Sequence, residues 1–368
     1  MPLAILGFGT AVPAATLDQR EALVVAESLC CRTPEHATWL PTMYGGTGIT
    51  KRHICLGREV VRDILGGTRE SGSPFLPTGG EDDRGPSTYE RMKIFRRVAP
   101  ELALKATAEA LAAAGKLPTE ITHLVTVSCT GFSAPGFDIA LVTELGLPPD
   151  VPRTHVGFMG CHGALNGLRV ANAFATADPR ACVLLCSVEL CSLHYHYGWD
   201  PQKIVANALF ADGAAALVGV GDAAAPSRAW RVRANGAHLV PEAAAAMTWD
   251  VGDHGFVMSL SKKIPEMIGK HLRGWLTSWL GRNGLALSEV ATWGIHPGGP
   301  KILDAVLGSL DLPANAVWAS REVLAEYGNM SSATGLFILK KLQEHGARGP
   351  LVALGFGPGL NIEAVLLE

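Results

Sequence analysis

An internal repeat limits the fold of this chain more than any other feature of the sequence. When the sequence is shifted by 168 residues, the segment from about 101 to 188 falls without a gap on 269 to 356. The strand-like run 124–128 then falls on 292–296, and helix-like and short apolar runs on either side also coincide. Repeated alternation of helix and strand indicates an α/β protein with layers of helices on mixed, mostly parallel sheets.

The repeat predicts two similar halves, about 1–222 and 223–368, related by a pseudo-twofold axis. Equivalent strand ends in such an arrangement face one crevice, which is where α/β sheets bind ligands. The connecting segment 66–87 is rich in Gly, Pro and Ser, which predicts an exposed loop.

Composition excludes several classes of protein. Of the 368 residues, 48% are hydrophobic and 18% are charged, which is unlike a disordered chain. The formal charge of −3 gives no global attraction to nucleic acid or to an anionic membrane. No apolar run approaches the length of a membrane span. Eight irregularly spaced cysteines do not form a disulfide scaffold, so we expect a cytoplasmic protein with reduced thiols.

Three residues of catalytic type occupy matching places in the two halves. The offset of 168 pairs Cys161 with Asn329, each at the start of the second helix of its half. His296 ends a strand and is followed by Pro-Gly-Gly. Because these ends face a shared crevice, we expect the three side chains to meet.

Their chemistry suits carbon–carbon bond formation from thioesters. A helix N-terminus and an imidazolium partner, here His296, would stabilise a thiolate on Cys161. Asn329 and a histidine N–H would hold the oxygen of a thioester enolate. Taken singly, each residue is more often a core cysteine, a structural histidine or a helix N-cap. Their joint placement in a duplicated fold favours catalysis.

Five motifs carry a resemblance over nearly the whole length. They are Gly157-Phe-Met-Gly-Cys161-His-Gly-Ala, Ala208-Leu-Phe210-Ala-Asp-Gly-Ala-Ala-Ala, Gly294-Ile-His296-Pro-Gly-Gly-Pro, Tyr327-Gly-Asn329-Met-Ser-Ser-Ala-Thr and Gly355-Phe-Gly-Pro-Gly359. The chain resembles the type III polyketide synthases, the chalcone-synthase-like group of the thiolase superfamily. The resemblance implies a thiolase-like αβαβα fold, a homodimer, and repeated condensation of malonyl-CoA onto an acyl-CoA starter, followed by ring closure to a pyrone or resorcinol.

The resemblance also implies residue roles. Cys161 would hold the growing chain, and His296 with Asn329 would decarboxylate malonyl-CoA and hold the enolate. Phe210 and Phe256 match two gates of the cavity. The wall of the cavity would include a loop formed by Gly355, Phe356, Gly357, Pro358 and Gly359. CoA thioesters would be the substrates, and we expect neither a cofactor nor a metal.

Several residues differ from those at the aligned positions of the plant members, and these differences make the prediction of the starter and of the CoA contacts more specific. Cavity threonines of those members align with Cys129, Cys191 and His194, and the two thiols suit an aliphatic starter. The methionine that enters the partner's cavity aligns with Ala134. The basic residues that bind CoA are replaced, which leaves Lys51, Arg52 and Lys301 as candidates and an acyl carrier protein as an alternative donor. The Trp-Asp…Gly-Phe run is similar to bacterial members that make alkylpyrones or alkylresorcinols.

Other functions remain as alternatives. A single-round condensing enzyme like ketoacyl synthase III carries the same triad. A non-catalytic thiolase-fold partner would be expected to lose the nucleophile. A zinc site formed by Cys182, Cys186, Cys191 and His194 is disfavoured. Cys182 and Cys186 lie on one face of an apolar strand, where we expect them to pack as small hydrophobic side chains. A dinucleotide loop at the last glycines is excluded because a strand-like run follows them.

Overall fold

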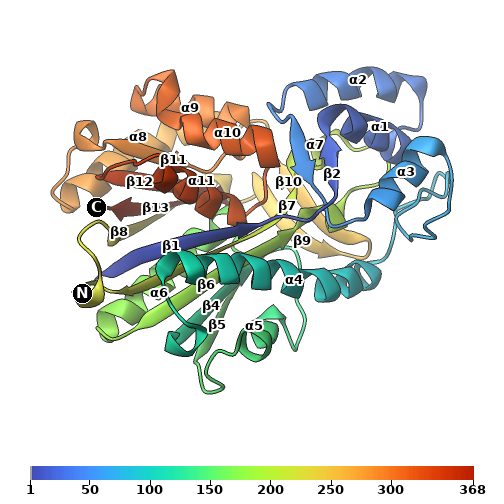
Figure 1. The fold of residues 1–368 in the computed structure, drawn as a ribbon. Coiled ribbons are helices and arrows are strands. Elements are labelled where there is room, and N and C mark those ends of the chain that lie inside the picture. The colour runs from blue at the N-terminus through green and yellow to red at the C-terminus, as the bar shows by residue number, and fades with distance from the viewer. Residues whose placement is uncertain (1) are drawn as a thin grey trace.

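A mixed sheet of nine strands runs through the computed structural model, which describes residues 2–368 (Figure 1). The strands lie in the order β11-β12-β13-β8-β1-β7-β6-β4-β5. Their bounds are β1 Leu3–Ala11, β4 His123–Ser128, β5 Arg153–Gly157, β6 Cys182–Leu190, β7 Asp212–Gly221, β8 Trp230–Leu239, β11 Thr292–Ile295, β12 Leu351–Gly357 and β13 Asn361–Leu367.

The strand order contains the duplication predicted from the repeat. One half reads β1-β7-β6-β4 and the other reads β8-β13-β12-β11. The halves meet where β1 and β8 pair at two positions, Ala4 with Arg231 and Ile5 with Trp230. The strands equivalent by the offset of 168, β4 with β11 and β6 with β12, occupy matching places in this order. The prediction of two related halves is therefore confirmed.

The sheet is mixed, as expected. Parallel pairing joins β4 to β5 and β6, and joins β11 to β12. The other pairs in the nine-stranded sheet are antiparallel among the residues described. Parallel pairing is thus confined to these two places. β12 and β13 are joined by a short turn, a connection that antiparallel strands can use and parallel strands cannot.

Helices form three layers around the sheet strands. The central layer is α6 (Gly163–Ala177) and α11 (Ala333–Glu344), whose apolar faces share one core with strands of both halves. The outer layers are α4 (Thr88–Ala114) with α5 (Phe137–Leu145), and α8 (Ile264–Arg282) with α9 (Pro300–Leu310), whereas α10 (Trp318–Tyr327) packs on α11 and contributes to the central core. This is the expected αβαβα arrangement. None of the helices described for residues 2–368 has both the length and the apolar character needed to cross a membrane.

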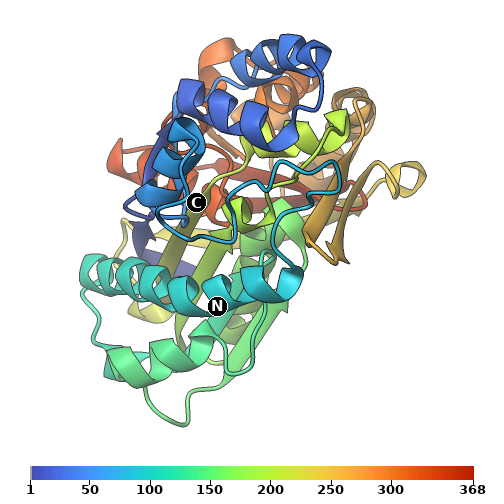
Figure 2. The ribbon, with the colours of Figure 1, turned by 90° about the vertical axis from the view of Figure 1, so that its right-hand side faces the viewer.

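Further helices gather at one end of the molecule (Figures 1 and 2). They are α1 (Gln19–Cys30), α2 (Pro34–Gly45), α3 (Arg58–Gly66) and α7 (Pro201–Leu209), with the short strands β2 (Thr16–Asp18) and β3 (Lys51–His53). Asp18 begins α1 by accepting from the main-chain N–H of Glu21, in a capping box. The group has its own apolar core, which includes Leu17, Val25 and Ile204. A separate hairpin, β9 (Met247–Gly252) with β10 (Gly255–Leu260), closes the same end.

The segment 67–87 crosses this end of the molecule without helix or strand (Figure 2). The prediction of an exposed loop is wrong at Phe75 and Leu76, which are buried. Tyr197 donates a hydrogen bond from its hydroxyl to the Phe75 carbonyl at 2.6 Å, which anchors the middle of the loop.

Candidate active site

Cys161 lies at the start of the central helix α6. It belongs to a short 3-10 turn, Gly160–His162, that leads directly into the helix. The turn between β12 and β13 presses on this segment, because a Cβ added at Gly160 would lie 2.1 Å from Pro358 Cδ. Gly160 also has a φ of 71°, a conformation that glycine adopts without strain. Only glycine at position 160 therefore allows the turn to approach the Cys161 segment this closely.

Asn329 reaches the sulfur of Cys161 from the other half. Its main chain is paired with the end of α7: Asn329 N–H donates to Leu209 O at 3.0 Å, and Ala211 N–H donates to Asn329 O at 2.9 Å. The side-chain oxygen accepts from Ser331 N–H at 2.8 Å, while Ser331 has a φ of 46°. This leaves the amide NH₂ group as the donor toward Cys161. Strain of this kind in non-glycine residues is typical of functional sites.

His296 follows β11 and is buried. Its main-chain N–H donates to Leu354 O at 2.8 Å, which holds it at the end of the strand. Neither ring nitrogen has a hydrogen-bond partner among residues 2–368. Buried polar atoms rarely lack a partner, and such a case calls for an explanation such as a missing ligand. The imidazole is therefore available to a substrate.

The electrostatics differ from the expected thiolate–imidazolium pair. Burial raises the pKa of the Cys161 thiol to about 12, while hydrogen bonds from Ser331 and Asn329 act in the opposite direction. Burial, together with nearby His162, lowers the pKa of His296 to about 3. Each group alone is thus neutral at pH 7. Transfer of the thiol proton to the imidazole would leave the net charge of the buried site unchanged.

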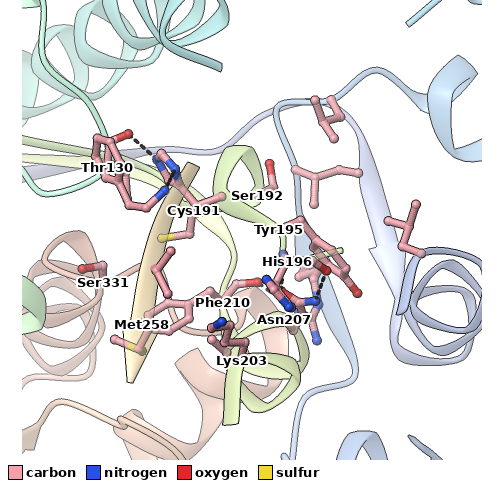
Figure 3. Close-up of a pocket in the computed structure, with 18 of the residues that line it drawn as sticks. Thr130, Cys191, Ser192, Tyr195, His196, Lys203, Asn207, Phe210, Met258 and Ser331 are labelled. Atoms are coloured by element: carbon pink, nitrogen blue, oxygen red, sulfur yellow. Dashed lines mark hydrogen bonds between the residues drawn. The ribbon is translucent and has the colours of Figure 1, made fainter. Parts of the chain in front are cut away.

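Cys161 lines a large, mostly apolar cavity. Figure 3 shows other residues of its lining, among them Cys191, Phe210 and Met258. The cavity holds about 1230 Å³ of space free of protein atoms, some of it open to solvent. His296 and Asn329 are buried and are not among the residues that line the cavity. Of the three predicted catalytic residues, the structure places Asn329 close enough to Cys161 to lower the pKa of its thiol. It places His296 beside His162, the next residue after Cys161.

Phe210 is the first of the two residues that the sequence predicts as gates. It follows the last residue of α7, lines the cavity, and pairs with Asn329 through an isolated β-bridge. The cavity-facing side of α7 carries Lys203, Ala206, Asn207 and Phe210, at the spacing of one helix face. Lys203, which pairs with Asp200 at 3.0 Å, was not identified from the sequence.

Phe256 also lines the cavity, but it is enclosed by other aromatic rings. Its ring stacks on His194 with centroids 4.1 Å apart and meets Trp249 edge-on at 5.7 Å. Met258 lies two residues further along β10, on the same face, and lines the cavity on the side of Phe210 (Figure 3). Sequence reasoning missed Met258. The alternation of side chains along a strand next to the Phe256 motif was the signal that could have found it.

The three residues that align with cavity threonines of the plant members all line the cavity here. Cys129, Cys191 and His194 are among its lining residues. Both ring nitrogens of His194 are engaged, because one contacts Thr130 O at 2.6 Å and the other accepts from Phe256 N–H at 2.9 Å. Burial lowers the pKa of His194 to about 3, so the ring is neutral. It joins the Cys129 segment to β10 and shapes the wall.

The glycine-rich loop contributes less to the wall than expected. Pro358 lines the cavity, whereas Phe356 is buried in the core between the sheet and α8. Gly355 and Gly357 pack on His162, where an added Cβ would lie 2.9 Å and 2.4 Å from its side chain. Gly359 forms the turn with a φ of 77°. The prediction for Phe356 is wrong because strand alternation turns its ring to the other face.

Arg52 is wrongly predicted as a CoA contact. It is 2% exposed, and its guanidinium donates to Asn207 O at 2.8 Å, to Phe210 O at 3.0 Å and to Ala208 O. These carbonyl groups lie at the C-terminal end of α7, so Arg52 caps that helix and is not accessible to a CoA phosphate. Lys51 and Lys301 are exposed and remain candidates.

The zinc alternative is not supported. Cys182 and Cys186 pack in the apolar core beneath α4, whereas Cys191 and His194 face the cavity. No group of three or more metal-ligating side chains was found in the part of the chain that the structure describes.

Glu189 is a buried carboxyl group beneath the catalytic segment. It accepts hydrogen bonds from Thr130 Oγ1 at 2.7 Å, from Cys129 N–H at 3.0 Å and from Ser332. Burial nevertheless raises its pKa to about 7. The folded protein therefore binds this proton more tightly than the unfolded chain does.

We expect the Glu189 carboxyl to destabilise the fold as the pH rises from about 4 to 8. Between the unfolded and folded pKa values the unfolded state binds fewer protons, so the free energy of unfolding falls with pH. Relative to Glu189→Gln, the wild type should lose roughly 3 kcal/mol over this range. Urea unfolding of both proteins at several pH values measures the difference, and a pH-independent difference would contradict the assignment.

Comparison with known proteins agrees with this geometry. The family model for the N-terminal domain of chalcone and stilbene synthases matches residues 2–223, and the model for their C-terminal domain matches residues 232–368. The chain belongs to the chalcone and stilbene synthase family. Together with the fold and the Cys161 site, this membership defines an acyltransferase.

Three similar proteins indicate which group within this family the chain belongs to. The "Alpha-pyrone synthesis polyketide synthase-like Pks18" of Mycobacterium tuberculosis is 35% identical over 294 residues, 77% of this chain and 75% of the relative. The 1,3,6,8-tetrahydroxynaphthalene synthase of Streptomyces peucetius is 33% identical over 366 residues, 98% and 91% of the two chains. The crystal structure of PKS-I from the brown alga Ectocarpus siliculosus has a TM-score of 0.90 and 31% identity, and covers 100% of this chain and 98% of that one. This chain is accordingly a type III polyketide synthase.

Proposed function

We propose that Cys161, His296 and Asn329 carry out starter loading, malonyl-CoA decarboxylation and chain extension. One observation carries this proposal. The Cys161 thiol lines the cavity and has its pKa lowered by Asn329 against the effect of burial, and the buried imidazole of His296 has no partner for either nitrogen among the described residues. In the proposed mechanism these residues supply a nucleophile, a proton acceptor and two N–H donors.

The proposed reaction begins when the thiol proton passes to His296 and the sulfur of Cys161 attacks the starter thioester. CoA leaves as its thiol by taking up that proton. Malonyl-CoA then loses CO₂, and the enolate oxygen accepts hydrogen bonds from His296 and from the Asn329 amide. The enolate carbon attacks the acyl group on Cys161, which forms the new carbon–carbon bond and releases the thiolate. The apolar cavity excludes water from the reactive β-keto chain.

An aliphatic starter and a pyrone or resorcinol product fit the lining best. Cys129 and Cys191 replace hydroxyl groups with thiols, which are weak hydrogen-bonding groups. The relative from Mycobacterium tuberculosis is named for α-pyrone synthesis, which supports this product class. CoA thioesters serve as substrates without a further cofactor. The matched ranges 2–223 and 232–368 support a boundary between the halves near residues 222 and 223.

Incubation of the purified protein with malonyl-CoA and a series of acyl-CoA starters tests the proposal. Mass spectrometry should detect pyrone or resorcinol products that contain at least two malonyl-derived units. Products with only one unit would favour a single-round condensing enzyme. Absence of both decarboxylation and product would indicate a non-catalytic thiolase-fold partner.

Lys51 and Lys301 are the proposed contacts for CoA phosphates. Lys301 lies in the first turn of α9, where negative groups are favoured by the helix dipole. The preceding Gly299 faces Leu209 at the end of α7, next to the Phe210 gate. An acyl carrier protein would deliver the starter through the same opening of the cavity. Offering one series of starters both on CoA and on an acyl carrier protein shows which of the two donors the enzyme uses.

We also propose a homodimer formed through the surface beside β5. This strand is at the edge of the sheet, and edge strands pair readily with other chains. Phe132, Phe158 and Met159 are exposed by 54%, 39% and 37% near this edge. Phe132 stacks on Phe256 with centroids 5.9 Å apart, so the exposed aromatic surface continues into the cavity wall. A second copy of the chain would cover this surface and seal the wall.

Replacing Phe132 with lysine is expected to convert the dimer to a monomer. The charge would be desolvated at the centre of an apolar interface, which is costly without a partner. Light scattering after size-exclusion chromatography measures the mass. Tyr89→Lys is the matched control, because Tyr89 is 68% exposed on α4 and lies outside this surface. A dimer that survives Phe132→Lys unchanged contradicts the proposed interface.

A further inference from the structure

His162 is a second buried imidazole beside the catalytic pair. It directly follows Cys161 in the 3-10 turn that leads into α6, and it is 2% exposed. After burial, its proximity is the second cause that lowers the pKa of His296. The steps proposed above assign no role to this ring.

Both nitrogens of the His162 ring have hydrogen-bond partners. Nδ1 lies 2.6 Å from Asn166 Oδ1, an oxygen that only accepts, so we assign the ring proton to Nδ1. Nε2 then accepts from the Asn361 amide at 3.4 Å. β12 packs directly on the ring, because a Cβ added at Gly357 would lie 2.4 Å from its Cδ2 atom. The ring is therefore held in one orientation between α6, β12 and β13.

The hydrogen bonds continue from His162 to an ion pair at the surface. The Asn361 amide also donates to Glu363 Oε1 at 3.0 Å. The same oxygen accepts from Arg169 at 2.9 Å. The side chain of Glu363 is 4% exposed and that of Arg169 is 43% exposed. Contacts thus lead from the buried imidazole through one amide and one carboxylate to a cation that reaches solvent.

The two charges of this ion pair act on His162 in opposite directions. Burial lowers the pKa of His162, a hydrogen bond with Asn166 and the charge of Glu363 raise it, and the charge of Arg169 lowers it. Hydrogen bonds and a nearby anion stabilise a buried imidazolium, and His162 has both. The ring nitrogens of His296 have no hydrogen-bond partner among residues 2–368. As the pH falls, His162 therefore takes up a proton before His296 does.

The other groups around His162 do not separate the effects of Glu363 and Arg169. The β12 residues that pack on the ring are glycines and carry no charge. Glu189 of β6 acts on the neighbouring Cys161, because burial and, to a smaller extent, the charge of Glu189 raise the pKa of the thiol. Protonation of Glu189 changes the thiol in the same way in the wild type and in variants of the ion pair.

We propose that His162 is a positioning residue that holds the Cys161 turn against β12 and β13 and transmits the charge of the Glu363–Arg169 ion pair to His296. The inference rests on the proposed function, because it takes His296 as the acceptor of the thiol proton. Neutral His162 leaves His296 free to take that proton. Protonated His162 places a second positive charge beside the imidazolium that would form, and like charges oppose each other. Transfer of the thiol proton then becomes unfavourable, and Cys161 loses its reactivity.

Alkylation of Cys161 by iodoacetamide between about pH 4 and 8 tests the inference. Peptide mapping by mass spectrometry gives the rate at Cys161 alone, and this rate should fall as His162 takes up its proton. Glu363→Gln removes the anion that favours this proton, so the fall should move to lower pH by about one unit. Arg169→Gln removes a cation that opposes it, so the fall should move to higher pH. This second shift should be roughly half a unit, because solvent screens the half-exposed cation.

Arg233→Gln is the matched control for the ion-pair variants. The Arg233 side chain is 44% exposed and also pairs with a glutamate, Glu368. The variant removes an equally exposed cation and should keep the wild-type pH profile. Shifts of Glu363→Gln and Arg169→Gln in the same direction, or no shift in either, would overturn the inference.

His162→Gln shows whether the two charges act through the ring. Glutamine retains an amide for hydrogen bonding but does not titrate. In this background Glu363→Gln and Arg169→Gln should leave the profile where it is. Shifts as large as those in the wild-type background would contradict transmission by His162. If His162→Gln does not fold, the directions of the two single-variant shifts decide the question.

The alkylation assay needs neither malonyl-CoA nor product formation. If the opposite shifts are found but the wild type makes no polyketide, the proposed function fails and the role of His162 remains. If the wild type makes polyketides but shares one pH profile with both ion-pair variants, only the inference about His162 fails.

Discussion

Cys161→Ala is expected to abolish covalent loading of the starter and all product formation. The sulfur is the nucleophile in the proposed reaction, and alanine offers no atom that can form the acyl bond. Mass spectrometry of the intact protein after incubation with an acyl-CoA should show the added acyl mass in the wild type alone.

Cys191→Ala provides the matched control for this experiment. Cys191 lines the same cavity, so its removal also deletes a cavity thiol and changes the local shape. This variant should still acquire the acyl mass, and peptide mapping should place it on Cys161. Normal loading of Cys161→Ala, or an acyl group on Cys191 in the wild type, would contradict the assignment.

Asn329→Ala is expected to keep starter loading but to lose chain extension. In the proposed reaction the amide donates to the enolate oxygen, and removal of one such donor typically lowers the rate by about 10²–10³-fold. Release of ¹⁴CO₂ from labelled malonyl-CoA measures decarboxylation, and intact-protein mass measures loading. Both assays on one preparation separate the two steps.

The main chain makes Asn329→Ala a clean test. Pairing with Leu209 and Ala211 uses the N–H and carbonyl of residue 329, which alanine retains. The position of Phe210 should therefore persist, and the melting temperature checks that the fold does. Loss of loading equal to the loss of extension would contradict a role restricted to the enolate.

The repeat explains why so much of the architecture could be predicted. Equivalent residues of a duplicated fold occupy equivalent places, so aligning the two halves brought Cys161 and Asn329 to matching helix starts. The same alignment put His296 after the strand equivalent to β4. A linear pattern sufficed because these positions are set by the topology of the main chain.

Features that depend on side-chain direction could not be predicted in this way. Arg52 was predicted as a CoA contact because it is basic, but its side chain turns inward to carbonyl groups at the end of α7. Met258 and Phe356 depend on which face of a strand each residue occupies. The neutral forms favoured for Cys161 and His296 arise from burial by many distant segments, which no local pattern records.

The pairing of Phe210 with Asn329 has a consequence for redesign of this enzyme. Phe210 and Asn329 share a β-bridge. Shifting the backbone of α7 to admit bulkier substrates would therefore also displace the side chain of Asn329. Met258 belongs to a separate hairpin and has no such link in the described hydrogen bonds. Side-chain replacements at Met258 should thus alter substrate size at a smaller cost in turnover than insertions or deletions in α7.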